Sequence, residues 1–218
     1  LDQARLLLSE IDNGTDLIKA RILLRTGDII GGIHHLESRK DETLSNIPPT
    51  RPQRFHREAS LLLSLFYAIA GEVEKCEYYA QRGINIGESL QSTFVQSVGY
   101  MRMGHALQLR NRHPWSTNGF DLAMDYYQQA IDKIEVTRIH VEPLWGMCRA
   151  LGYSGRIEEA EQQAATSLEI AAKAGDQWIG LLIRLSLGAG QVLSGNYEEA
   201  QESLTLAEST ALNVQDPY

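Results

Sequence analysis

The sequence has little of what secreted, membrane-spanning or nucleic-acid-binding proteins need. Its two cysteines, Cys76 and Cys148, are too few for a disulfide framework, which favours a reducing cytoplasm. No apolar run approaches the ~20 residues of a membrane span, and the first residues do not read as a signal peptide. The net charge of −8 argues against a nucleic-acid-binding surface. We therefore expect a soluble, cytoplasmic protein.

Motifs for catalysis and metal binding are also missing. The sequence has no GxSxG, no HExxH and no GxxxxGK[ST]. The adjacent His34 and His35 would point ~100° apart on a helix, so they cannot easily bind one ion. Each cysteine fits a small buried hydrophobe better than a nucleophile. We expect no enzyme, no metal and no cofactor.

What the sequence does have is an internal repeat. "GRIEEA" at 155–160 is followed forty residues later by "GNYEEA" at 195–200. "GEVEKC" at 71–76 and "GDIIGG" at 27–32 fit the same frame, and "GFDLAM" at 119–124 is the loosest match. The paired glutamates could form an acid/base site, but their recurrence favours the first turn of a helix, where carboxylates face the positive end of the helix dipole.

Small residues keep a fixed distance from each turn. Two helices of a hairpin approach closely only where one of them presents a small side chain. Seven residues before each turn, with the third turn counted from Asn111, the small residues are Ala20, Ser64, Gly104, Cys148 and Gly188. Five residues after the turn they are Gly32, Cys76, Ala160 and Ala200. Met124 breaks the pattern in the third hairpin. The spacing predicts five hairpins with turns near 27, 71, 111–119, 155 and 195.

The flanking segments are helical in pattern. Apolar residues recur every three to four positions, and no segment alternates with period two for long enough to be a strand. Asp16, Ser92 and Asp176 are candidate N-caps, and the turn glycines suit the C′ position. We expect one helical repeat domain over 1–218. Because both ends look like parts of further hairpins, we expect it to be a fragment of a longer protein.

This spacing of small residues resembles the tetratricopeptide repeat, although the period of forty exceeds the usual ~34. The resemblance implies an all-α fold of antiparallel helix hairpins stacked into a right-handed superhelix, a TPR-like α-solenoid. The phrases "GRIEEA" and "AKAGD", with the segments at 22–37 and 61–84, look like the sensor region of MalT-like, LuxR-type bacterial transcription regulators. That family implies a flanking ATPase and a helix-turn-helix module; neither is in this chain.

In such arrays the first helices line the concave side, which is used for binding. Counting from the turns gives a candidate ligand- or partner-binding set: Arg21, Arg25, Met101, His105, Gln108, Glu142, Trp145, Arg149 and Tyr153. Aromatic, cationic and amide groups suit a peptide or a small polar ligand, and Arg149 could pair with a carboxylate. Alternatively, Trp145 and Tyr153 pack against neighbouring repeats and Arg149 is simply solvated.

Two functions follow. The first is a non-catalytic sensor region that binds an inducer or a protein on its concave face within a transcription regulator. The alternative is a general TPR scaffold that binds a peptide or protein without small-molecule sensing. Neither predicts direct nucleic-acid or membrane contact. Trp115, in the 111–119 insertion, is either a partner anchor or folds back onto the third hairpin; burial of the indole favours folding back.

Overall fold

The computed structural model describes residues 16–38, 50–110, 117–135 and 140–214. These residues form helices joined by short connections, with no strand among them. The chain divides into two compact units, residues 1–102 and 103–217. Helix α7 (Thr93–Arg110) contributes residues to both units. Each unit is described by itself.

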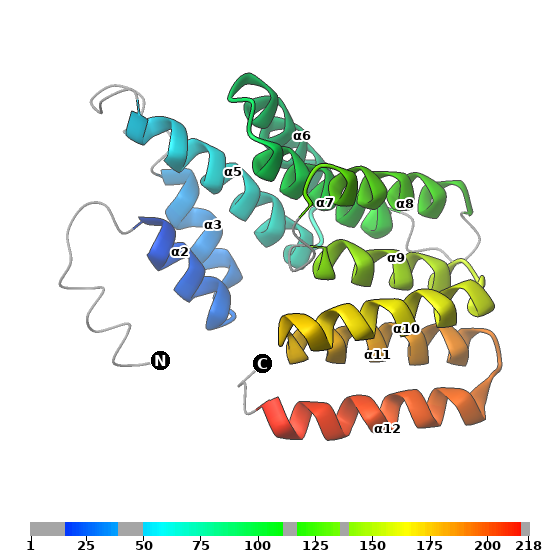
Figure 1. The fold of residues 1–218 in the computed structure, drawn as a ribbon. Helices are drawn as coiled ribbons and strands as arrows, with labels where there is room; N and C mark the ends of the chain where they lie inside the picture. The colour runs from blue at the N-terminus through cyan, green and yellow to red at the C-terminus, as the bar shows by residue number, and fades with distance from the viewer. Residues whose placement is uncertain (1–15, 39–49, 111–116, 136–139, 215–218) are drawn as a thin grey trace. The chain divides into compact units, whose positions relative to one another are not determined.

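The first unit contains two helical hairpins. Helices α2 (Asp16–Arg25) and α3 (Ile29–Ser38) pack together and turn at Gly27. Helices α5 (Thr50–Ala70) and α6 (Val73–Ser89) pair in the same way around Gly71. Helix α5 also packs on α2 and α3 (Figure 1).

The second unit contains the remainder of α7 and five further helices. These are α8 (Thr117–Asp132), α9 (Val141–Tyr153), α10 (Ile157–Ala174), α11 (Gln177–Leu193) and α12 (Tyr197–Val214). Helix α9 packs on α8, α10 and α11, and α11 packs on α10 and α12 (Figure 1). The apolar core between α9, α10 and α11 includes Cys148, Ala164 and Ile183.

The hairpin turns depend on glycine because the backbone there is left-handed. Gly27, Gly71, Gly155 and Gly195 have φ of +73°, +78°, +78° and +83°. A side chain disfavours that conformation, whereas glycine adopts it freely. The four glycines stand where the repeat places them, and Glu158, Glu159, Glu198 and Glu199 lie exposed in the first turns of the helices that follow. Their position agrees with the helix-dipole interpretation rather than with an acid/base site.

The small residues form the interior contacts of the hairpins. Ser64 donates a hydrogen bond from Oγ to the carbonyl of Cys76 at 3.0 Å. The thiol of Cys148 lies 3.8 Å from the carbonyl oxygen of Ala160. All nine are buried, as the spacing predicts: Ala20, Gly32, Ser64, Cys76, Gly104, Cys148, Ala160, Gly188 and Ala200.

The third hairpin departs from the sequence-based alignment. Gly119 is not a turn glycine, since it lies inside the first turn of α8 and is not among the glycines with positive φ. The small buried residue closest to the expected position is Ala123, while Met124 is half-buried. Tyr127 fills the seam instead: a Cβ on Gly104 would lie 2.6 Å from its ring. Residues 111–116, with Trp115, lie outside the described part of the chain.

Candidate ligand-binding face

Four predicted site residues lie along one side of α9. Glu142, Trp145, Arg149 and Tyr153 are spaced three or four residues apart, so a helix brings them onto one face. All four are half-buried. We call these four residues the α9 face.

Arg149 is held between two aromatic rings of its own helix. Its Cζ lies 5.9 Å from the centroid of Trp145 and 5.6 Å from that of Tyr153. A guanidinium within ~6 Å of an aromatic centroid is attracted to the ring face, so these contacts restrict the arginine. Across the described ranges, Arg149 has no recorded hydrogen bond or ion pair to another residue. The side chain is therefore positioned while its donors stay available.

Trp145 is fixed by the helices on both sides of it. Its Nε1 donates a hydrogen bond to Ser186 Oγ of α11 at 2.9 Å. The His105 ring of α7 lies 5.6 Å away at a tilt of 60°. The indole thus has a defined orientation beneath the guanidinium. The repeat did not single out Ser186, which stands one residue beyond the position equivalent to Trp145 in the next unit.

His105 and Gln108 lie beneath this face rather than on it. Their exposed fractions are 7% and 4%. Gln108 donates from Nε2 to the carbonyl oxygen of Gly146 at 2.5 Å, which ties α7 to α9. The His105 ring also lies 5.5 Å from that of Tyr127. Both residues therefore position α9, and direct ligand contact at either would require the chain to open.

Helices α9 and α11 approach closely at a pair of glycines. A Cβ built on Gly190 would lie 2.7 Å from the Cα of Gly152. Because neither residue has a side chain, the two backbones come together beside the α9 face. On α11 the large apolar side chains Leu185 and Leu193 remain exposed at 42% and 57%.

The other predicted site residues belong to the first unit. Arg21 is exposed and pairs with Glu58 at 3.1 Å, which joins α2 to α5. Arg25, in the last turn of α2, is also exposed. Met101 is only 6% exposed, so it contributes mainly to the core. The α9 face is therefore the part of the predicted set that the structure gathers on one surface.

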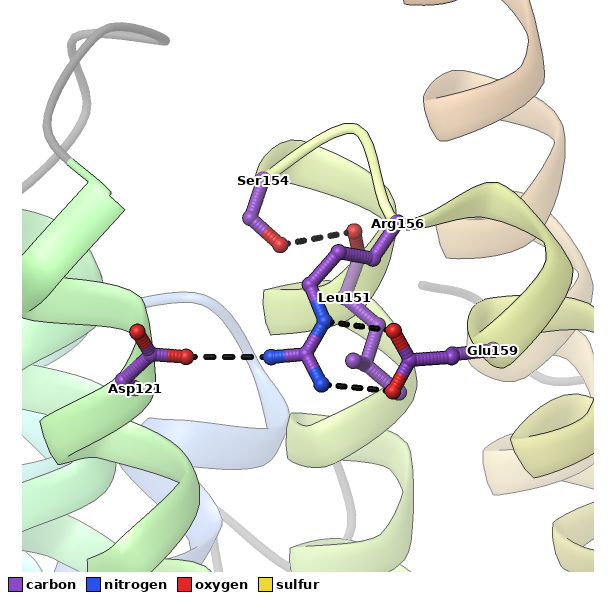
Figure 2. Close-up of polar contacts among 5 residues, drawn as sticks. All are labelled: Asp121, Leu151, Ser154, Arg156 and Glu159. Carbon is purple, nitrogen blue, oxygen red and sulfur yellow. Dashed lines mark hydrogen bonds and ion pairs between the residues drawn. The ribbon is translucent and has the colours of Figure 1, made fainter.

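Arg156, in the same unit, differs from Arg149 because its guanidinium is paired with carboxylates. Arg156 donates from Nε to Glu159 Oε1 at 2.8 Å and from Nη2 to Oε2 at 2.5 Å, and from Nη1 to Asp121 at 3.0 Å (Figure 2). The hydrogen bonds from Arg156 lower the pKa of the Glu159 carboxyl. That carboxylate is ionised at neutral pH, which makes it unsuited to act as a general acid.

The thiols are unsuited to nucleophilic chemistry. Burial raises the pKa of Cys148 to about 12 and also raises the pKa of Cys76, so both remain protonated at neutral pH. Both side chains are completely buried. Within the ranges that the structure covers, no cluster of three or more His, Cys, Asp or Glu side chains could hold a metal ion. Among the same helices, none has the length and apolar character needed to cross a membrane.

Comparison with solved structures identifies the fold. A Rap protein in complex with competence and sporulation factor matches with a TM-score of 0.74 at 13% identity, over 99% of this chain and 59% of that chain. RapI in its apo form matches with a TM-score of 0.66 at 12% identity, over 92% of this chain and 70% of that chain. No protein-family model and no curated protein matches the sequence. The structural similarity confirms the predicted class: an all-α, TPR-like arrangement of antiparallel helical hairpins.

Proposed function

We propose that this chain is a non-catalytic binding module that holds an extended segment of a peptide or partner protein on the α9 face. One observation carries the proposal: Arg149 is positioned by Trp145 and Tyr153, yet has no recorded acidic partner among the residues described. An arginine kept in place without a partner is ready to bind a group from outside the chain. Arg156, which has two carboxylates beside it, lacks this property.

A peptide or protein segment suits the surface better than a small molecule. The α9 face is one side of a helix with half-buried rings, and the neighbouring helix α11 carries the exposed side chains of Leu185 and Leu193. Extended segments use such surfaces through several side-chain contacts, whereas small ligands need to be largely enclosed. The similar Rap structure contains competence and sporulation factor, which is an example of this fold with a bound partner.

The test is peptide binding with two separate substitutions on the α9 face. Peptides would be selected from a random display library on the purified chain, and their affinities measured by fluorescence anisotropy. We expect Arg149→Ala and Trp145→Ala each to weaken binding by about tenfold or more, as interface anchors do. Arg184→Gln is the control, because the Arg184 guanidinium donates a hydrogen bond to the carbonyl of Gly180 in its own helix. Unchanged affinity in both α9 variants would remove this face from consideration.

The more specific sensor function remains a second candidate. The "GRIEEA" and "AKAGD" phrases favour a cytoplasmic, MalT-like transcription regulator whose repeat region senses an inducer or an inhibitory protein. The full-length gene would test it by the presence or absence of a flanking ATPase and helix-turn-helix module. A thermal-shift screen of sugars, nucleotides and amino acids addresses the same question, because a small-molecule inducer would raise the melting temperature.

A further inference from the structure

We propose that the bound segment carries a carboxylate that pairs with Arg149 and, about three residues away, an aliphatic side chain that packs on α11. This inference rests on the proposed function and specifies its ligand. It comes from two stripes of side chains that the repeat places at equivalent positions on neighbouring first helices.

The two stripes occupy equivalent positions in the repeat. On α9 the stripe is Trp145, Arg149 and Tyr153; forty residues later, α11 has Leu185, Ala189 and Leu193. In each helix the members stand four residues apart and so share one face. One stripe therefore combines a cation with two aromatic rings, while its neighbour is entirely aliphatic.

Helices α9 and α11 are in direct contact. The two helices are joined at two points along their length. One is the hydrogen bond from Trp145 to Ser186, and the other is the close approach of Gly152 and Gly190. Helices packed this closely have axes ~8 Å apart, and looser pairs ~10 Å. An extended chain advances ~3.3 Å per residue, so a segment crossing from one stripe to the other needs about three residues.

The two stripes suit different chemical groups of a ligand. The planar guanidinium of Arg149 matches a carboxylate in a bidentate geometry. Tyr153, which also has no recorded hydrogen bond to a described residue, offers a hydroxyl donor nearby. Leu185 and Leu193 are exposed at 42% and 57%, so an aliphatic group laid on them removes apolar surface from water.

Net charge limits how acidic the segment can be. The chain carries a net charge of −8, so a run of acidic residues would be repelled. A single carboxylate beside aliphatic residues gains the contact with Arg149 and avoids most of that repulsion. The inferred ligand is therefore an amphipathic extended segment with one carboxylate.

The experiment is a selection with two random heptapeptide libraries on the full chain. One library is fused through its C terminus, so that only side chains supply carboxylates; the other ends in a free C-terminal carboxylate. We expect enriched peptides to place Leu, Ile, Val or Met two to four positions from an Asp, a Glu or the free terminus. Comparing the libraries tells which source supplies the carboxylate.

Two variants and two matched controls complete the design. Arg149→Gln should abolish the preference for a carboxylate, and Leu193→Asn the preference for an aliphatic residue. The first control is Arg184→Gln in α11, outside the stripe. The second is Leu212→Asn in α12, where Leu212 is 77% exposed. Both should leave the two preferences unchanged. Circular dichroism checks that every variant stays helical.

The outcomes separate this inference from the proposed function. Enriched peptides that bind through Arg149 but show no carboxylate–aliphatic pairing would overturn the inference and leave peptide binding intact. Preferences that persist in Arg149→Gln and Leu193→Asn would also overturn it. No enrichment from either library would reject the proposed function, and the inference with it.

Discussion

Arg149 and Arg156 stand seven residues apart in the same unit and have opposite surroundings. Arg156 satisfies its guanidinium with Glu159 and Asp121 in water-exposed ion pairs, which add little to stability. Arg149 instead lies over two rings, and no carboxylate among the described residues pairs with it. At the scale of single residues, the two guanidinium groups therefore differ in whether their donors are bound to carboxylates among the described residues.

Alanine substitution should affect stability differently at two glycines of α11, Gly180 and Gly190. Ala at Gly190 would place a Cβ 2.7 Å from the backbone of Gly152, whereas at Gly180 the nearest atom would be 3.5 Å away. Both changes gain ~1 kcal/mol of helix propensity. Overpacking against backbone costs ~1–3 kcal/mol. We expect Gly180→Ala to be neutral or stabilising, and Gly190→Ala to be ~1–3 kcal/mol less stable than it in urea unfolding. Equal stability would mean that α9 and α11 do not meet at these glycines.

The N-cap of α11 gives a second residue-scale prediction. Asp176 Oδ1 accepts a hydrogen bond from the backbone N–H of Ile179 at 3.0 Å. Asp176→Ala should lower the free energy of unfolding by about 1 kcal/mol, since that donor loses its partner. Asp176→Ser retains a capping oxygen and should recover most of the loss in the same urea titration. A serine variant as unstable as the alanine one would contradict the capping role.

At the scale of helices and hairpins, the repeat predicted well what lies within a hairpin and less well what lies between hairpins. In these hairpins a small residue seven before the turn lets the two helices approach closely, so Ser64, Cys148 and Gly188 could be located by counting. Contacts between hairpins depend on how one pair of helices packs on the next. Counting along the repeat therefore could not predict the role of Ser186 or the close approach of Gly152 and Gly190.

The third hairpin shows where counting fails. Gly119 and Met124 were placed by extending the forty-residue frame across an insertion, and an insertion changes the register of everything after it. In the structure Gly119 is helical and the seam is closed by Tyr127 against Gly104. The burial of His105 and Gln108 could not be predicted from the sequence for a related reason. Polar residues on the predicted binding face are expected to be exposed, and only the packing of the neighbouring helix shows that they are covered.

The buried thiol of the fourth hairpin predicts a dependence of stability on pH. Burial raises the pKa of Cys148 from its ordinary value of 9.0 to about 12. The folded chain favours the neutral thiol. The contribution of the Cys148 side chain to the free energy of unfolding is therefore complete below about pH 9 and is lost as the pH rises toward 12. The stability difference between the wild type and Cys148→Ala should therefore shrink over that interval. Urea titrations at several pH values would measure it, and parallel curves would contradict thiol burial.

At the scale of the whole molecule, a helical repeat transmits disturbance mainly to adjacent repeats. Gly190→Ala should therefore weaken the amide-exchange protection of α9, α11 and α12 and leave that of α5 and α6 unchanged. Hydrogen exchange followed by mass spectrometry resolves these helices separately. A uniform loss of protection along the chain would show that the molecule unfolds as one cooperative body.

Arg149 is proposed to recognise a carboxylate on a bound segment. The most direct measurement is a double-mutant cycle that combines Arg149→Gln in the protein with Asp→Asn, or Glu→Gln, in a selected peptide; where the C-terminal carboxylate is the group selected, amidation replaces the peptide change. Affinities would be measured by fluorescence anisotropy. We predict that neutralising the peptide weakens binding about tenfold in the wild type and hardly at all in Arg149→Gln. An equal loss in both proteins would contradict the account.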